Sequence, residues 1–353
     1  MRIKLAILEK DANYLKRIVS VFNTKYSDKL EIYSFTDYEV ALGELQNSKI
    51  DIFIVSDTFE VDVKRLPKRC GFAYFVDSHN VETIREQMAI CKFQKADLIY
   101  KQILSLYSEN ASDISGLKLT DDVCKLIAFT SLGGGAGSST MAAACAICFA
   151  KRGKKVLHLN LDSFGSSDMF FNAEGQFDMS DVIYALKSKK TNIALKIESC
   201  IKQDASGVNF FSQTKIALDM MELNTDDILR LISELTVLGI YDYIVIDMDF
   251  GIGRNYLDIF SRIHSIVVTG DGTDISNCKI QRAFQSMILL DKSMDISLLN
   301  RMYLLYNKFS SKTGKMIDSN HIKILGGAPI YKQGTAIQIA EQISGMNVFD
   351  ELA

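Results

Sequence analysis

Short apolar runs alternate with amphipathic stretches along the first part of the chain. The runs lie at residues 4–8, 30–33, 51–55, 72–76 and 97–100. Apolar runs of this length, bounded by polar segments, are typical of buried strands, and strands that alternate with helical patterns build parallel sheets. The pattern therefore predicts a small parallel α/β domain over residues 1–107.

A polar stretch follows, and then a second series of strand-like runs begins. Residues 108–122 contain no long apolar periodicity and predict a linker. Helix-like segments separate the later runs, which lie at residues 125–130, 155–161, 208–211, 243–247, 263–268 and 302–306. This series predicts a larger, doubly wound parallel-sheet domain over residues 123–353, with its ligand crevice at the carboxyl ends of the strands.

Composition narrows the class of protein. A chain of 353 residues exceeds the usual size of one core, and 48% hydrophobic with 24% charged residues is typical of globular domains. The net charge of -3 gives no general electrostatic reason to bind nucleic acid. No apolar run reaches the length of about 18 residues that a membrane span requires, and the N-terminus lacks a signal-peptide pattern. We therefore expect a soluble cytoplasmic protein.

A glycine-rich segment joins the first run of the second domain to a helix-like segment. Residues 131–140 read Ser-Leu-Gly-Gly-Gly-Ala-Gly-Ser-Ser-Thr, and residues 141–150 are mostly small. In a phosphate-binding loop, backbone N–H groups and a helix N-terminus face the phosphates while a lysine adds charge. Here Ser138 stands where that lysine belongs. The segment predicts a phosphate-binding loop, or phosphate cradle, that lacks the positive charge of the usual lysine. The alternative interpretation is a plain connecting turn.

Polar residues end several of the later runs. Asp247 ends the run 243–247, where the acid of a Walker-B strand holds Mg²⁺ through water. Asn160 and Asp162 stand two residues apart, so they point to one face of the sheet. Asn307 follows a late run, and Pro329 lies in the next loop. In this order the features of residues 125–330 resemble the MinD/ParA ATPases.

That resemblance implies ATP as the ligand and gives roles to individual residues. Ser139 would offer the Mg²⁺ hydroxyl, Asp247 would make the outer Mg²⁺ contact, and Asp162 would orient the attacking water. Asn307 would contact the polar edge of the adenine, and Pro329 to Tyr331 would pack against the adenine ring. The residues implied to contact the nucleotide are Gly134, Gly135, Ala136, Gly137, Ser138, Ser139, Thr140, Asn307, Pro329, Ile330 and Tyr331.

The resemblance also marks what is missing. The ATPases carry a second, signature lysine five residues before the loop lysine, and Gly133 stands at that position here. Asn160 replaces a family aspartate, which weakens the metal site. Because both lysine positions are lost, at Gly133 and Ser138, we expect ATP binding with slow or absent hydrolysis.

The first domain resembles a response-regulator receiver in architecture but not in chemistry. Ser56 occupies the phosphoacceptor position, and Lys10 sits beside Glu9 in the acidic site. Lys101 matches the lysine that follows the fifth receiver strand. We therefore expect a pseudo-receiver used for protein contacts, and the alternative is a shifted phosphoacceptor at Asp57.

A degenerate receiver in front of an atypical MinD/ParA-like domain is similar to the TadZ/CpaE proteins of the tight-adherence (Flp) pilus secretion system. The resemblance implies an ATP-stabilised homodimer that sits at a cell pole and contacts the pilus secretion ATPase and other Tad/Flp components. Two alternatives stay open: a genuine slow ATPase switch of the ParA/MinD type, and a receiver-regulated signalling protein.

Overall fold

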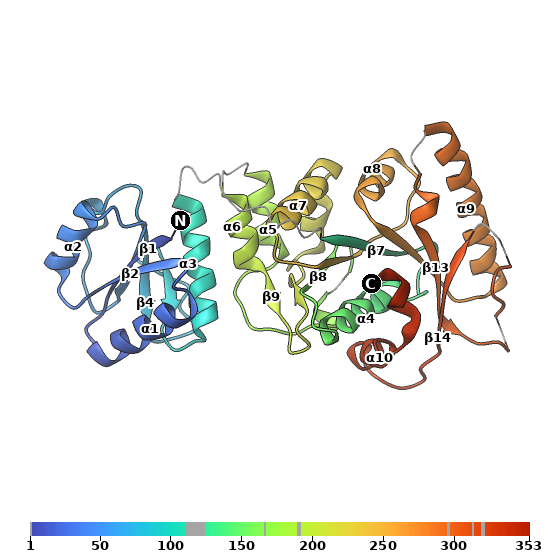
Figure 1. Cartoon of the computed structure of the whole chain (residues 1–353). Helices are drawn as coiled ribbons and strands as arrows, with labels where there is room; N and C mark the ends of the chain where they lie inside the picture. Colours follow the sequence, from blue (N-terminus) through green and yellow to red (C-terminus); the bar gives the residue numbers. More distant parts are fainter. Residues whose placement is uncertain are drawn as a thin grey trace. The chain divides into compact units, whose positions relative to one another are not determined.

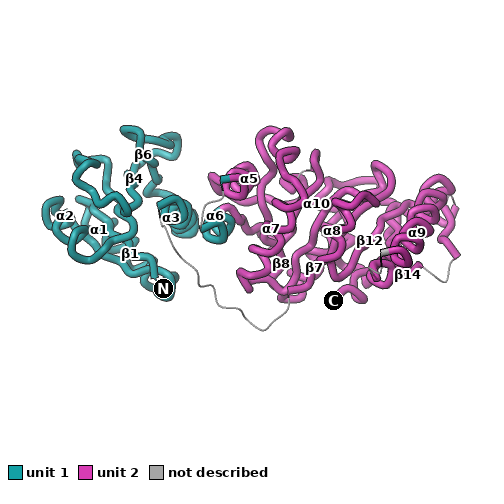
Figure 2. Tube along the Cα trace, turned by 90° about the horizontal axis from the view of Figure 1, so that it is seen from above, with its two compact units in different colours: residues 1–116, 188–199 teal, residues 117–187, 200–353 magenta. Residues whose placement is uncertain are grey.

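The chain forms two compact units, each with its own sheet (Figures 1 and 2). The first unit comprises residues 1–116 and 188–199, and the second comprises residues 117–187 and 200–353. The computed structural model describes residues 2–110, 124–165, 167–188, 192–294, 297–312, 314–318 and 322–353. Of the predicted linker, only Ser108 to Asn110 lie within these ranges, where they end a helix; residues 111–122 lie outside them.

The first unit is built on a six-stranded sheet that is parallel except for one edge strand. In spatial order its strands are β2 (Leu30–Phe35), β1 (Ile3–Leu8), β3 (Ile52–Ser56), β4 (Gly71–Val76), β6 (Gln87–Cys91) and the antiparallel β5 (Thr83–Ile84). Its helices are α1 (Ala12–Lys25), α2 (Tyr38–Asn47) and α3 (Ala96–Asn110), with the 3-10 turn η1 (Val63–Arg65). One hydrophobic cluster joins α1 and α3 to the sheet, and a second joins α2 to it.

The fifth strand of the first domain was predicted in the wrong place. Residues 97–100 belong to α3, and the fifth parallel strand is β6. A short apolar run is ambiguous between a strand and the start of a helix. The residues form a helix because Ile99, Ile103 and Leu106 continue the apolar pattern at helical spacing and are buried against the sheet.

A segment distant in sequence completes the first unit. Helix α6 (Ile193–Cys200) follows the first helices of the second unit along the chain, yet residues 188–199 group with residues 1–116 (Figure 2). The buried Lys196 ammonium donates to Ser105 Oγ of α3 at 2.7 Å, and Lys29 pairs with Glu198 at 2.9 Å. Leu195 packs against the hydrophobic cluster under α3.

The described residues of the second unit form an eight-stranded sheet, in which only the edge strand β9 is antiparallel. In spatial order its strands are β14 (Lys323–Pro329), β13 (Met302–Phe309), β12 (Ser265–Gly270), β7 (Lys125–Ser131), β11 (Tyr243–Asp247), β8 (Val156–Asn160), β10 (Asn209–Phe210) and β9 (Lys202–Gln203). The carboxyl ends of β14, β13, β7, β11 and β8 therefore meet at one edge of the sheet.

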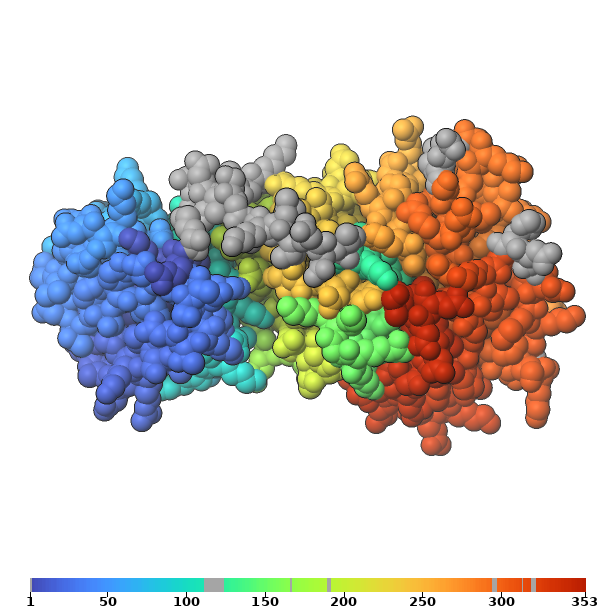
Figure 3. All heavy atoms as spheres, in the orientation of Figure 1, coloured from blue at the N-terminus to red at the C-terminus, as the bar shows by residue number. Residues whose placement is uncertain are grey.

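Helices cover both faces of this sheet (Figure 1). On one face α4 (Ser138–Lys151) packs against α10 (Ala336–Ile343) and the 3-10 turn η5 (Asn347–Leu352) in a single hydrophobic cluster. In the space-filling view, α4 and the C-terminal residues form one continuous surface (Figure 3). The remaining helices are α5 (Met179–Lys187), α7 (Thr225–Val237), α8 (Arg254–Arg262) and α9 (Asp274–Met294), with 3-10 turns η2 (Ser167–Met169), η3 (Ala217–Glu222) and η4 (Leu299–Arg301).

None of the helices within the described ranges combines the length and the apolar character that crossing a bilayer requires.

Candidate functional site

The glycine-rich segment forms a turn between β7 and α4, as its sequence predicts. Gly135 and Gly137 have φ values of 81° and 87°, a region that L-residues with a side chain rarely adopt. Gly137 is the N-cap of α4 and offers no side chain to cap it. The first amides of α4, beginning at Ser138, therefore have no capping side chain from this position and remain donors for an anion.

The end of strand β13 holds the turn from the side. The Asn307 side chain is 3% exposed; its Nδ2 donates to the Ala136 carbonyl at 3.0 Å, and its Oδ1 accepts from the Lys308 amide at 2.9 Å. A Cβ atom on Gly137 would lie 2.2 Å from Asn307 Nδ2. The glycine and the asparagine thus fit each other, and neither position tolerates added bulk.

Two lysines from outside the loop stand beside it. Lys308 Nζ donates to the Gly135 carbonyl at 2.8 Å. Lys279, on α9, places its Nζ 3.7 Å from where a Cβ atom on Gly133 would be. From the sequence, Lys308 and Arg254 are candidates for a replacement cation, with a solvated or interface charge as the favoured interpretation of each. The sequence does not indicate Lys279, because a residue on a distant helix leaves no signal in the loop motif.

Asp247 lies at the carboxyl end of β11, next to the first turn of α4. It is 1% exposed, and its Oδ2 has no hydrogen-bond partner. Burial raises the pKa of this carboxyl to about 7; a hydrogen bond from Ser139 opposes the rise, and the charges of Asp162 and Asp249 add to it. An orphaned buried carboxylate oxygen beside a hydroxyl is a donor set that suits a hard divalent cation. The residues present therefore fit Mg²⁺, with Ser139 and Asp247 as its holders.

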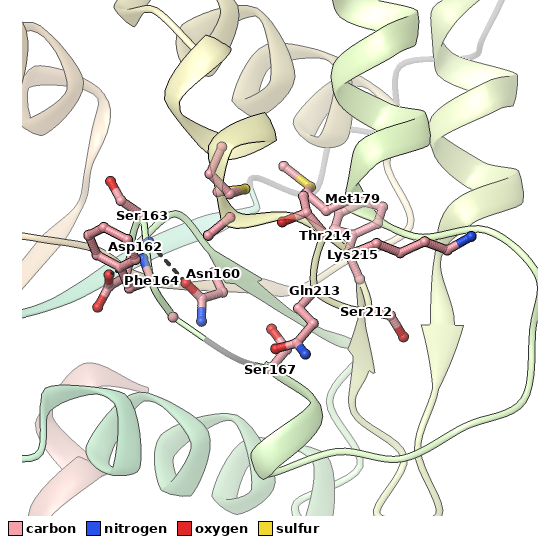
Figure 4. Close-up of a pocket in the computed structure, with 14 residues that line it drawn as sticks. Asn160, Asp162, Ser163, Phe164, Ser167, Met179, Ser212, Gln213, Thr214 and Lys215 are labelled. Atoms are coloured by element: carbon pink, nitrogen blue, oxygen red, sulfur yellow. Dashed lines mark hydrogen bonds between the residues drawn. The ribbon is translucent and has the colours of Figure 1, made fainter.

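The chain after β8 turns tightly around Asn160. Asn160 Oδ1 accepts from the Asp162 amide at 2.9 Å, and Asp162 Oδ1 accepts from the Phe164 amide at 2.9 Å. The same turn lines a cavity of about 230 Å³. Lys215 also lines this cavity, and Figure 4 shows its side chain extending away from the other labelled side chains. Partial desolvation raises the pKa of the Asp249 carboxyl, and the charge of Asp162 raises it further. The acids implied for metal and water therefore lie close enough to interact.

The residues implied for the adenine lie at the neighbouring strand ends. Strand β14 ends at Pro329, which is paired with Phe309 of β13. Ile330 is 55% exposed, while Tyr331 packs partly against the cluster formed by α4 and α10. The structure thus brings these residues to the same sheet edge as the loop, and it shows Asn307 bonded to the loop backbone. The adenine contacts remain a prediction.

In the first domain an internal ion pair occupies the acidic site. Lys92, which directly follows β6, lies 2.8 Å from Asp77 and 3.3 Å from the buried Glu9. Burial lowers the pKa of the Lys92 ammonium, but the hydrogen bond with Asp77 and the charge of Glu9 outweigh it and raise the pKa. Lys92 therefore holds the place after the fifth strand that the sequence assigned to Lys101, which lies in α3.

The predicted acceptor positions differ in exposure. Ser56 is fully buried and shares a hydrogen bond of 3.0 Å with the Thr58 hydroxyl, whereas Asp57 is exposed. Lys10 lies over the Phe59 ring at 4.8 Å and reaches the Thr58 carbonyl at 3.4 Å. Lys10 thus lies against the segment that directly follows Ser56 and Asp57.

Comparison with known proteins assigns each unit to a domain family. A family model described as "TadZ-like, receiver domain" matches residues 1–108, and one described as "AAA domain" matches residues 124–298. Together with the two sheets, these matches confirm the predicted fold class of a receiver-like domain followed by a MinD/ParA-like parallel-sheet domain. A search of the curated proteins gave no match.

The chain is also similar to several solved structures. A ParA family ATPase from Chlorobium tepidum TLS is 20% identical, with 64% of this chain and 92% of that chain covered and a TM-score of 0.47. The MinC:MinD cell division protein complex from Aquifex aeolicus is 21% identical, with 62% of this chain and 86% of that chain covered and a TM-score of 0.46. The septum site-determining protein MinD from Pyrococcus horikoshii OT3, complexed with Mg-ADP, is 14% identical, with 65% of this chain and 96% of that chain covered and a TM-score of 0.49.

Proposed function

The chain joins a TadZ-like receiver domain to an AAA domain of the MinD/ParA type, and from this premise we propose that it is a nucleotide-gated assembly scaffold for a tight-adherence (Flp) pilus secretion system. ATP holds a homodimer, hydrolysis is slow or absent, and the receiver unit supplies a surface for protein contacts. The observation that supports the proposal is the glycine turn before α4, in which Gly135 and Gly137 have positive φ values and the two expected lysine positions are Gly133 and Ser138.

The cradle supports binding at a useful affinity. A charge at a helix N-terminus contributes about 0.3–1 kcal/mol, and a hydrogen bond to a charged group contributes about 1.5–3 kcal/mol. Several loop amides acting together therefore approach the roughly -8 kcal/mol of micromolar binding. When bound, Mg²⁺ neutralises phosphate charge; Ser139 and Asp247 would hold it, and a nearby cation favours the ionised form of Asp247.

Rapid hydrolysis lacks support from the loop. Phosphoryl transfer depends on cationic groups that stabilise the charge of the transferring phosphoryl, and a single arginine supplied in this role is worth about 10³–10⁵ in rate. Neither Gly133 nor Ser138 can supply such a group. The nucleotide therefore acts as a structural ligand that gates assembly.

The internal ion pair of the receiver unit supports a role in protein contacts. Lys92 already forms ion pairs with Glu9 and Asp77, so a cation of the chain itself balances the charge of these carboxylates. We propose that the unit contacts the pilus secretion ATPase and other Tad/Flp components, and that the protein acts in the cytoplasm at a cell pole.

The test is the fate of bound nucleotide. Purified protein is incubated with ATP and Mg²⁺, the bound nucleotide is released and identified, and the molecular mass is recorded by light scattering. Intact ATP in a dimer after hours is the expected result. A chain that retains no nucleotide, or one whose mass is unchanged by ATP, would contradict the proposal.

A slow ATPase switch is the second candidate. The charges of Asp162, Asp247 and Asp249 influence one another at the strand ends, which is where a water-orienting acid belongs. This candidate predicts conversion of ATP to ADP with loss of the dimer, abolished by Asp162→Asn. The scaffold predicts that Asp162→Asn leaves the bound ATP and the dimer unchanged.

A further inference from the structure

We propose that Lys308 and Lys279 supply, from outside the loop and within the same chain, the positive charge that a phosphate-binding loop normally carries itself. Their ligand is the phosphate chain of a nucleoside di- or triphosphate. The inference rests on the proposed function, because it concerns the same cradle, and it adds the side chains that recognise the phosphates.

Lys308 is held at its backbone by Asn307 and contacts the loop through its ammonium. Its amide donates to Asn307 Oδ1, its φ is 54°, and its Nζ reaches the Gly135 carbonyl at 2.8 Å. An ammonium has three N–H donors. One bond to Gly135 therefore leaves two donors for phosphate oxygens on the solvent side of the loop, where Lys308 is exposed.

Lys279 stands at the other lost position. Its Nζ lies 3.7 Å from the Cβ site of Gly133, the residue where the resemblance places the signature lysine. Lys279 is exposed, and within the described ranges neither its ammonium nor that of Lys308 pairs with a carboxylate. Two unneutralised cations thus flank a turn whose own residues carry no charge.

A second observation points to a ligand at this turn. Asp247 Oδ2 is buried without a partner beside Ser139, on the opposite side of the loop residues from strand β13. The partners of a Mg²⁺-bound phosphate chain are oxygen ligands for the metal on one side and cations for the phosphates on the other. Asp247 with Ser139 offers the first set, and Lys308 with Lys279 offers the second.

The arrangement has a consequence for assembly. Both lysines belong to the chain that carries the loop, so the charge at the phosphates does not depend on a second copy. A monomer therefore carries the charge that holds the phosphates, and any dimer that the nucleotide promotes raises the apparent affinity further by reciprocal linkage.

The experiment compares nucleotide affinities by calorimetric titration with ATP and with AMP, each in the presence of Mg²⁺. The variants are Lys308→Gln and Lys279→Gln, and the control is Lys312→Gln, an exposed lysine whose backbone amide donates to Ser310 Oγ. We expect each test variant to bind ATP about tenfold or more weakly, the loss of roughly one charged contact. AMP, which lacks the outer phosphates, should bind all variants within about twofold.

A rescue separates charge from loop support. Adding Ser138→Lys to Lys308→Gln returns a cation to the loop and should restore ATP affinity. If the added lysine restores nothing, Lys308 acts only by holding Gly135 and the proposal fails. If both variants bind ATP as tightly as Lys312→Gln, the lysine assignment falls while the nucleotide-binding function stands. If the unmodified chain binds no ATP, the lysine assignment and the proposed nucleotide-binding function are both refuted.

Discussion

Replacing Gly137 with alanine tests the geometry of the cradle directly. The substitution places a Cβ atom 2.2 Å from Asn307 Nδ2 and forces an alanine to adopt a φ of 87°. Asn307 cannot yield easily, because it is buried and bonded to the loop at Ala136 and to the Lys308 amide. The substitution therefore strains the backbone and breaks the contact that holds the loop.

The expected cost follows from these two effects. A left-handed conformation costs an L-residue roughly 1–2 kcal/mol. Leaving a buried donor or acceptor unsatisfied costs about 1–3 kcal/mol. Together they predict a loss of about 2–5 kcal/mol in the stability of the second unit. For a domain of this size, each kcal/mol lowers the unfolding temperature by about 2–4 °C.

The assay is differential scanning calorimetry, with Gly134→Ala as the matched control. A Cβ atom on Gly134 meets nothing within 4 Å, so this variant should stay within about 0.5 kcal/mol of the original. Combining Gly137→Ala with Asn307→Ala removes the clash, so the double variant should lose less than the sum of the single losses. Equal unfolding temperatures for Gly137→Ala and Gly134→Ala would refute the reasoning.

Three further predictions concern buried charges and the receiver site. The pKa of Asp247 is raised to about 7, so its contribution to stability is fully present below about pH 4 and is lost as the pH rises through 7. Asp247→Asn should remove this part of the pH dependence and make the nucleotide-free protein more stable than the original at pH 8. Urea titrations at pH 4 and pH 8 measure both free energies of unfolding. If the variant shows the same difference in free energy between the two pH values as the original, the prediction is contradicted. Lys92→Ala leaves Glu9 buried without its cation and should cost the first unit about 3–5 kcal/mol by calorimetry, whereas the exposed Lys10→Ala should change little. Acetyl phosphate should add no phosphoryl mass to the protein, and a gain that Asp57→Asn abolishes would instead establish the shifted acceptor.

Sequence patterns predicted the elements whose signals are local. Strand β7, the glycine turn and α4 appear where the apolar run, the glycines and the small residues place them. Strand β11 ends at Asp247 as predicted, because a fully buried strand is an uninterrupted apolar run that stops at the first charge.

The errors arise where the deciding contact is distant in sequence. Residues 97–100 were assigned to a strand because the burial of α3 against the sheet is a tertiary effect that a four-residue run does not record. Lys92 was missed for the same reason, since only the pairing of β6 with β4 identifies it as the lysine after the fifth strand. Lys279 and Lys308 each lie more than 100 residues from the loop along the chain, and no local motif encodes their positions beside it.

The loop separates two requirements that an ordinary phosphate-binding loop combines. Gly137 is required by geometry, because Asn307 occupies the space that any side chain would need. The lysine positions are required only by charge, and charge acts over several ångströms, so a cation from β13 or α9 can serve the same phosphates. A chain can therefore lose both loop lysines and keep a functional cradle, but it cannot lose Gly137 while Asn307 remains. Under the proposed function, the same separation accounts for binding without rapid hydrolysis. Amides and nearby cations would hold the phosphate chain, whereas the transition state needs a cation placed on the transferring group itself.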